Sequence, residues 1–248
     1  MARHAAPRPQ YRWWIPATVG VIAVALVLMI VVIDRSGEDE STPTAGGASS
    51  ETEVVVTEVA DPEQSDLGDV DSGEESDPMS DGPVDAPVKL VVFSDYQCPY
   101  CAAWSQDTLP KMLDYVDSGD LRIEWREVNV FGSASEQAAK AAYAAALQDK
   151  HWEFHNAMFA GGKPRSPDEL TPEALTTTAE EIGLDTDEFT ADMNSQKTAE
   201  AVADNAAMGT DLGAFSTPTF ILDGQPYVGA QPTDVFVDAV ETAKKGQN

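Results

Sequence analysis

Two cysteines, Cys98 and Cys101, are the only cysteines of the 248-residue chain, and Pro99 and Tyr100 separate them. Cysteines three apart in the first turn of a helix can reach the Cα separation that a disulfide needs, about 4.4–6.8 Å. A disulfide that closes so short a loop removes little entropy from the unfolded chain, so it stabilises a fold weakly. The spacing therefore predicts a disulfide that is formed and broken during function. Half of a zinc site is the alternative, and it needs ligands from elsewhere.

The attacking species in thiol–disulfide exchange is a thiolate, so the place of each cysteine in the helix matters. Unpaired N–H groups and the positive end of the helix dipole lower the pKa of a cysteine at a helix N-terminus. We therefore expect Cys98 to have the lower pKa, because Cys101 lies one turn further in. Pro99 stiffens the turn, and Tyr100 brings no cation to the thiolate, so both residues are expected to tune the pair.

The elements that position this pair are predicted from the pattern of apolar residues. The segment before the cysteines is a short apolar run rich in valine, which is typical of a buried strand. Asp223-Gly224 is a strong hairpin signal between two later apolar runs. The expected order is strand, helix, strand, helical block, two strands and helix, at residues 88–93, 98–116, 121–130, 133–212, 219–222, 225–228 and 233–245. This order predicts an α/β fold with a mixed sheet flanked by helices.

The N-terminus contains an uncharged apolar run, residues 13–33, after a basic segment, residues 1–12. As a helix the run would be about 31 Å long, close to the thickness of a bilayer's hydrocarbon core. We therefore predict one transmembrane helix over 13–33. Basic residues before the helix place segment 1–12 in the cytoplasm and the rest of the chain outside. A cleaved signal peptide is the alternative, but its apolar region would be shorter.

Residues 34–86 are rich in Asp, Glu, Ser, Thr, Gly and Pro, and Arg35 is their one basic residue. Such a composition buries too little apolar surface to offset the entropy of ordering, so we predict a disordered acidic linker. A short strand at Val54–Val56 is the alternative for its one apolar patch. Residues 87–248 are enough chain for one domain. The formal net charge of −28 argues against nucleic-acid binding.

Three segments give residues 87–248 a marked resemblance to the DsbA-like thioredoxin family, in particular its membrane-anchored members in actinobacteria and other Gram-positive bacteria. A CxxC pair alone is a weak signal, but a CxxC pair after a strand, followed much later by Thr-Pro-Thr-Phe before a hairpin, is specific. The resemblance implies a thioredoxin fold with a helical insertion over about residues 133–212. The segments that carry it are APVKLVVFSDYQCPYC, SASEQAAKAAYAAALQDKHWEFHNAMF and GTDLGAFSTPTFILDGQPYVGA.

The resemblance also implies roles for individual residues. Cys98 would be the nucleophile and Cys101 the resolving thiol. Pro218 would be a cis-proline that faces the disulfide, with Thr217 just before it. The backbone of Thr217 could then pair with an extended substrate, in the manner of strand addition.

The function implied is that of an extracytoplasmic thiol–disulfide oxidoreductase that introduces disulfides into exported proteins. It would need no cofactor and act as a monomer on unfolded, cysteine-containing proteins, and a membrane protein of the DsbB or vitamin-K-epoxide-reductase type would reoxidise it. The alternative is a reductase or isomerase fed with electrons from the membrane, because strongly oxidising members of the family often have histidine where Tyr100 stands. A binding or chaperone module with an incidental disulfide is a third reading.

Several acidic residues are candidates for proton transfer near the thiols. Asp95 lies three residues before Cys98 and could be a buried proton relay, with a polar loop residue as the alternative. Glu124 and Glu127, in the strand predicted over 121–130, could also lie near the thiols.

His151 and His155 are four residues apart and could share a metal ion on one face of a helix. The segment HWEFH is not the metalloprotease pattern HExxH, and no cysteine or carboxylate completes a known spacing. The aromatic residues Trp152 and Phe154 indicate packing instead. We therefore predict no metal site.

Overall fold

The computed structural model describes residues 70–246. The predicted cytoplasmic segment, the transmembrane helix at 13–33, the strand at Val54–Val56 and the linker as far as residue 69 lie outside the described residues. Within the described range, no helix is both long enough and apolar enough to cross a membrane.

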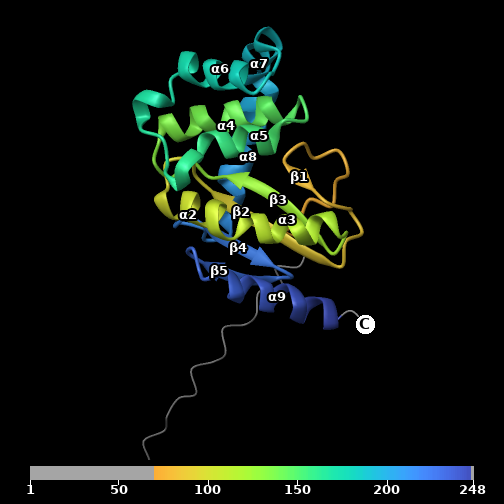
Figure 1. Cartoon of the computed structure of the whole chain (residues 1–248). Helices are drawn as coiled ribbons and strands as arrows, with labels where there is room; N and C mark the ends of the chain where they lie inside the picture. Colours follow the sequence, from red (N-terminus) through yellow and green to blue (C-terminus); the bar gives the residue numbers. More distant parts are fainter. Residues whose placement is uncertain (1–69, 247–248) are drawn as a thin grey trace, which may run out of the picture. The chain divides into compact units, whose positions relative to one another are not determined.

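A five-stranded mixed sheet forms the centre of the domain, in the order β1-β3-β2-β4-β5 (Figure 1). β2 is parallel to β3 and antiparallel to β4, while β1 joins β3 and β5 joins β4 in antiparallel pairs. This arrangement confirms the predicted mixed sheet. The strands are β1 (Ser80–Asp81), β2 (Val88–Ser94), β3 (Leu121–Glu127), β4 (Thr219–Leu222) and β5 (Gln225–Val228).

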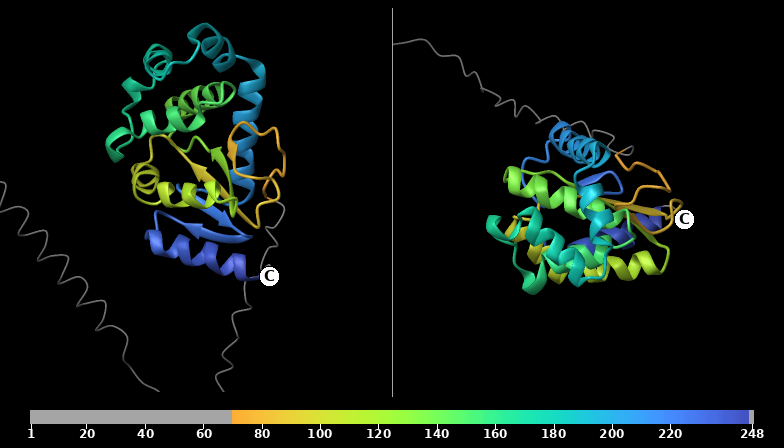
Figure 2. Two further views of the ribbon diagram at one scale, coloured as in Figure 1. Left: turned by 45° about the vertical axis from the view of Figure 1, so that its right-hand side comes forward. Right: turned by 90° about the horizontal axis from the view of Figure 1, so that it is seen from above.

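Helices cover both faces of this sheet. The face that carries Leu90 and Val92 packs against α2, α3 and α9, and the face that carries Val91 and Phe93 packs against α8. Helices α4 to α7 form a group at one side of the sheet, and α8 leads back to it (Figures 1 and 2). The helices are α2 (Pro99–Asp107), α3 (Leu109–Asp117), α4 (Ser133–Ala146), α5 (His151–Met158), η1 (Ala160–Gly162), η2 (Pro167–Glu169), α6 (Pro172–Glu181), α7 (Thr186–Met193), α8 (Gln196–Asp211) and α9 (Thr233–Gly246).

Two predicted boundaries are wrong. The single helix expected over 98–116 is broken at Thr108, between α2 and α3. Pro110 has no N–H to donate to the preceding turn, so the first helix ends and Thr108 begins the second. The strand expected over 121–130 ends at Glu127, because the backbone turns after it through left-handed conformations.

Residues 70–86, which we call the strap, pack on the domain although they were predicted to be disordered linker. Met79 and Ala86 are buried, and β1 pairs with the outer edge of β3. The backbone N–H of Ser72 donates to Oε2 of Glu124 at 2.7 Å, across 52 positions of sequence. The prediction of disorder is therefore wrong for the strap, because composition alone does not report contacts with a distant strand.

Candidate active site

Cys98 and Cys101 lie at the start of α2, directly beyond the C-terminal end of β2. Cys98 is the residue before the first helical position, which Pro99 occupies. The backbone N–H of Cys98 donates to the carbonyl of Asp95 at 2.9 Å, which turns the chain from strand to helix. Both cysteines are buried and both are free thiols, so the structure represents the reduced pair.

The two thiols have opposite acidities. The pKa of Cys98 is lowered from 9.0 to about 6, chiefly by the hydrogen bond from the Cys101 thiol, while burial opposes the shift. Thr217 and the N–H groups of Cys101 and Tyr100 lower it further. Burial, and then the hydrogen bond and charge of Cys98, raise the pKa of Cys101 well above its ordinary value. The prediction that Cys98 has the lower pKa is confirmed.

The loop before β4 meets the cysteine pair. The peptide bond between Thr217 and Pro218 is cis, as the resemblance implies. The thiol of Cys98 donates to the carbonyl oxygen of Thr217 at an Sγ···O distance of 3.1 Å. The structure therefore brings together two segments that lie 119 positions apart in the sequence. That Thr217 and Pro218 bind substrate stays a prediction.

An apolar rim surrounds this contact. Within residues 70–246 the large exposed apolar side chains fall in the segments that border Cys98 and Thr217. Phe131 is held beside the active-site loop because its N–H donates to Oδ2 of Asp95 at 3.2 Å. Sequence analysis missed most of this rim, because an isolated apolar residue in a loop carries no periodic signal. Its members are Tyr100 (65% exposed), Val130 (42%), Phe131 (54%), Phe215 (75%) and Val228 (57%).

Asp95 is a buried residue that fixes the loop before α2. Its Oδ1 accepts hydrogen bonds from Oγ of Ser135 at 2.6 Å and from the N–H of Gln97 at 2.8 Å. Its Oδ2 accepts the bond from Phe131. Three donors thus occupy the carboxylate, and none of them is a thiol. These contacts favour the reading of Asp95 as a polar loop residue over that of a proton relay.

Glu124 and Glu127 lie on opposite faces of β3, because side chains alternate along a strand. In the pairing with β2, Glu124 is opposite Val91 and Glu127 is opposite Ser94. Ser94 lies on the face that packs against the cysteines, and Val91 lies on the other. The expectation that Glu124 approaches the thiols is therefore wrong, whereas Glu127 does face the site.

The two histidines are buried packing residues of α5. Nδ1 of His155 lies 3.4 Å from the hydroxyl of Tyr96, and its Nε2 lies 3.0 Å from Oγ of Ser105. The ring of His151 packs against Trp152 at a centroid distance of 4.6 Å. No group of three or more metal-ligating side chains gathers anywhere in the described domain.

Acid should destabilise the domain through His151. Burial lowers its pKa in the folded state to about 3, whereas an unfolded histidine titrates near 6.5. Below pH 6.5 the unfolded chain therefore binds a proton that the folded domain does not. As the pH falls well below 6.5, the decrease in the free energy of unfolding should approach about 1.4 kcal/mol per pH unit from this residue alone. Denaturant unfolding between pH 6.5 and 5 checks this, and His151→Gln should reduce the slope by one proton.

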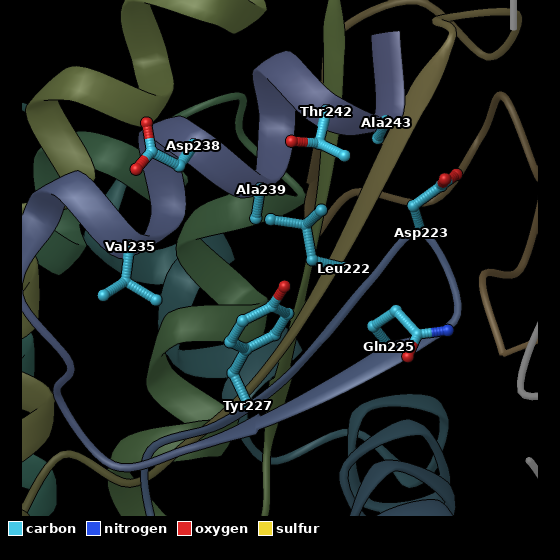
Figure 3. Close-up of a pocket in the computed structure, with 9 residues that line it drawn as sticks. All are labelled: Leu222, Asp223, Gln225, Tyr227, Val235, Asp238, Ala239, Thr242 and Ala243. Atoms are coloured by element: carbon cyan, nitrogen blue, oxygen red, sulfur yellow. The ribbon is translucent and has the colours of Figure 1, made fainter. Parts of the chain in front are cut away.

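A hollow lies between the β4–β5 hairpin and α9 (Figure 3). Its volume is about 450 Å³, and Asp223 and Asp238 lie at opposite sides of it. None of the residues that line it is a cysteine or a histidine, and none comes from the active-site loop or the cis-proline loop. The exchange chemistry therefore belongs to the cysteine pair and not to this hollow.

Comparison with known sequences gives two kinds of relative. One is "Na(+)/H(+) antiporter NhaA 3" of Salinispora tropica, which is 32% identical over 65% of this chain and 24% of that protein. The chain thus spans about a quarter of the length of such antiporters, and their transport activity is not transferred. The other is "Disulfide bond formation protein D" of Bacillus subtilis, 25% identical over 67% of this chain and 77% of that protein.

Solved structures agree with the second kind. Oxidised BdbD from Bacillus subtilis superposes with a TM-score of 0.61 at 26% identity, covering 67% of this chain and 92% of that one. A thioredoxin-like oxidoreductase from Silicibacter pomeroyi gives 0.57 at 27% identity, covering 69% and 99%. The sequence model of the thioredoxin family matches residues 74–242, more than half of the chain. Since that match includes both cysteines and the cis-proline, the chain belongs to the thioredoxin family.

Proposed function

We propose that the protein is a thiol–disulfide oxidoreductase that introduces disulfides into other proteins through Cys98 and Cys101. The observation that carries the proposal is the Cys98 thiol, whose pKa is about 6 and which touches the carbonyl of Thr217. A thiolate that is stable in the reduced protein is a good leaving group, so it favours transfer of the disulfide to a substrate. The relatives whose printed name is disulfide bond formation protein D support this direction.

The proposed cycle starts from the oxidised pair. A substrate thiolate attacks Sγ of Cys98, the bond between the two cysteines breaks, and Cys101 leaves and takes up a proton. A second substrate thiol then attacks the substrate sulfur of this mixed disulfide, and Cys98 leaves as a thiolate. The substrate has lost two electrons and two protons, and the protein holds one thiolate and one thiol. A disulfide or quinone oxidant must later remove the two electrons.

A polypeptide is the proposed substrate. The apolar rim around Cys98 offers exposed aromatic side chains that suit the apolar segments of an unfolded chain. When Cys98 is in the disulfide, its thiol no longer donates to the carbonyl of Thr217. That carbonyl is then free to accept a hydrogen bond from an extended substrate backbone. Rim and backbone together would hold a cysteine-containing segment over the sulfur.

We place this activity outside the cytoplasm, where disulfides persist. The apolar run at 13–33 would anchor the chain as a single-pass membrane protein with its N-terminus in the cytoplasm, and the acidic segment before the strap would act as a spacer. A membrane protein of the DsbB or vitamin-K-epoxide-reductase type would reoxidise the pair, and the domain would act as a monomer. A reductase or isomerase would instead be kept reduced in the cell, so the redox state of the pair in growing cells separates the two directions.

Cys101→Ser should trap substrates. In this variant the Cys98 thiolate forms a mixed disulfide by attacking a disulfide of a substrate, which releases the other substrate sulfur as a thiolate. No neighbouring thiol remains to resolve the mixed disulfide, so covalent complexes should accumulate. Non-reducing electrophoresis of cells that express the full chain measures them, and reduction should dissolve them. Cys98→Ser is the matched control and should trap nothing. Equal trapping by the two variants, or none by either, would show that Cys98 is not the nucleophile.

A further inference from the structure

A tight turn after β3 carries two of the exposed apolar side chains near the cysteine pair. The N–H of Gly132 donates to the carbonyl of Asn129 at 3.1 Å, so Val130 and Phe131 are the two central residues of a β-turn. Val130 is 42% exposed and Phe131 is 54% exposed. We call residues 128–132 the apolar turn.

The apolar turn is fastened at two points to the loop that precedes the cysteines. At its start, the N–H of the buried Val128 donates to the carbonyl of Ser94 at 2.9 Å. Further along, the N–H of Phe131 donates to Oδ2 of Asp95 at 3.2 Å. The apolar turn therefore has a fixed position relative to the cysteine pair, and a ligand that binds it does not have to order it first.

Asp95 joins the apolar turn to the nucleophile. Its carbonyl accepts the N–H of Cys98 at 2.9 Å, while its carboxylate accepts the N–H of Phe131. Oγ of Ser135 in α4 and the N–H of Gln97 donate to Oδ1, so the carboxylate is held in one orientation. Hydrogen bonds to a carboxylate are about twice as strong as those between neutral groups. One buried side chain thus sets the position of the apolar turn relative to Cys98.

The fixed support of these exposed side chains favours a role in recognition. A single exposed apolar residue is ordinary on a protein surface. Here two are adjacent, and a buried carboxylate holds them beside the loop of the nucleophile. Aromatic residues are enriched among those that contribute most of the binding energy of an interface, and a preformed support lowers the entropic cost of binding. The apolar turn therefore suits an apolar side chain close to the cysteine of a polypeptide.

We propose that Asp95 is a positioning residue of the exchange reaction, and that the apolar turn it holds selects polypeptides with an apolar side chain close to their cysteine. The proposal rests on the proposed function and adds a source of selectivity to it. The side chain of Asp95 acts through Phe131, whose backbone it holds. A polypeptide that lacks such a side chain gains nothing from the apolar turn, so the selectivity is a difference between two polypeptides.

Two serine- and glycine-based peptides with a single cysteine test the selectivity. One carries phenylalanine and the other serine two residues to each side of the cysteine, where an extended chain points its side chains to the same face. The measurement is the rate constant for opening of the oxidised pair of the full chain at equal peptide thiolate. We expect the phenylalanine peptide to react about tenfold faster, which is about 1.4 kcal/mol. Phe131→Ala should bring the ratio of the two rates close to one.

Asp95→Asn tests the positioning, because asparagine keeps an oxygen for Ser135 and Gln97 but turns an amide N–H toward the N–H of Phe131. The ratio of the two peptide rates should fall about as far as in Phe131→Ala, and no further in the double variant. The ratio cancels any change in the thiol itself. A purely structural role would slow both peptides alike, and a ratio that stays near ten would overturn the proposal. Glu136→Gln, on the exposed face of α4, is the matched control and should keep the ratio.

Gly132→Ala decides the matter if Asp95→Asn does not fold. Gly132 has a φ of +94°, and a Cβ there meets no atom within 4 Å, so alanine strains the apolar turn without a clash. The ratio should fall here too, and an unchanged ratio would overturn the proposal. If neither peptide forms a mixed disulfide through Cys98 of the unsubstituted protein, the proposed function fails. If both react at the same rate, the proposed function stands and the selectivity of the apolar turn fails.

Discussion

Replacement of Cys101 by alanine is expected to raise the pKa of Cys98 and to remove most of its thiolate at neutral pH. The hydrogen bond from the Cys101 thiol is the largest cause of the lowered pKa. With a pKa of about 6, Cys98 is about 90% thiolate at pH 7, whereas a thiol with a pKa of 9.0 is about 1% thiolate. Once the pKa of Cys98 exceeds the pH, each further pKa unit lowers its thiolate population by about tenfold.

The ultraviolet absorbance of the thiolate and the rate of alkylation of Cys98, both followed against pH, measure this change. Cys101→Ser is the matched control, because its hydroxyl can still donate to the Cys98 sulfur. Its titration should lie between those of the unsubstituted protein and the alanine variant. Identical titrations in all three proteins would show that the helix N-terminus, and not Cys101, sets the acidity of Cys98.

The same shift links acidity to stability and to redox potential. The folded pKa of Cys98 lies below the unfolded value, so its contribution to the stability of the reduced protein is complete above pH 9. That contribution is lost as the pH falls through about 6. Its upper limit is about 4 kcal/mol, or about 90 mV of oxidising power. The oxidised protein lacks this contribution, so the reduced protein should be the more stable form at pH 7.

The order of elements could be predicted because each has a local signal. The valine-rich run before the cysteines gave β2, and the turn at Asp223-Gly224 gave β4 and β5 with the bounds that the structure has. The break at Thr108 was missed, although Pro110 signals it, because the apolar pattern runs on through both helices. Strands and helices can thus be predicted from the pattern of neighbouring residues. The break between two helices depends on a single residue, the proline that lacks an N–H.

The cysteine pair could be located from sequence because its spacing and its place after a strand are local. The residues that surround the pair could not be predicted in the same way, because they come from distant segments of the chain. Alternation along β3 puts Glu124 and Glu127 on opposite faces of the sheet, but only the register between β2 and β3 shows which of them shares a face with the cysteines. Phe215 gave no signal at all, since nothing in its neighbourhood shows that its loop lies against Cys98. Contacts across more than a hundred residues depend on the tertiary fold.

Loss of the charge of Glu124 is expected to destabilise the domain strongly and to leave its redox chemistry unchanged. Oε1 of Glu124 accepts from Nε of Arg122 at 3.1 Å, and Oε2 accepts from the guanidinium of Arg126 at 2.6 Å. Both arginines are buried. Removal of one partner from a buried ion pair costs about 3–5 kcal/mol, because it leaves the other charges uncompensated. Glu124→Gln should therefore lower the free energy of unfolding by about that amount.

The strap explains why this network exists. Arg122 donates to the carbonyl of Glu74 at 2.6 Å and to Oγ of Ser80 at 2.7 Å, and Arg126 pairs with Asp77 at 2.7 Å. The two arginines of β3 thus fasten residues 70–86 over the open edge of the sheet. A chain that begins at residue 87 would leave both guanidinium groups without these acceptors. We expect it to be less stable than Glu124→Gln.

Denaturant unfolding of the oxidised protein measures the effect, with Glu136→Gln as the matched control. Glu136 pairs with Lys140 on an exposed face of α4, where an ion pair contributes less than about 1 kcal/mol. Glu124 lies on the face of the sheet away from the cysteines, so Cys98 should keep its pKa near 6 in Glu124→Gln. A shifted pKa of Cys98 with unchanged stability would show that Glu124 acts on the thiol and not on the fold. A loss of stability with an unchanged thiol would show that Glu124 serves the fold, through the two buried arginines, and not the cysteine pair.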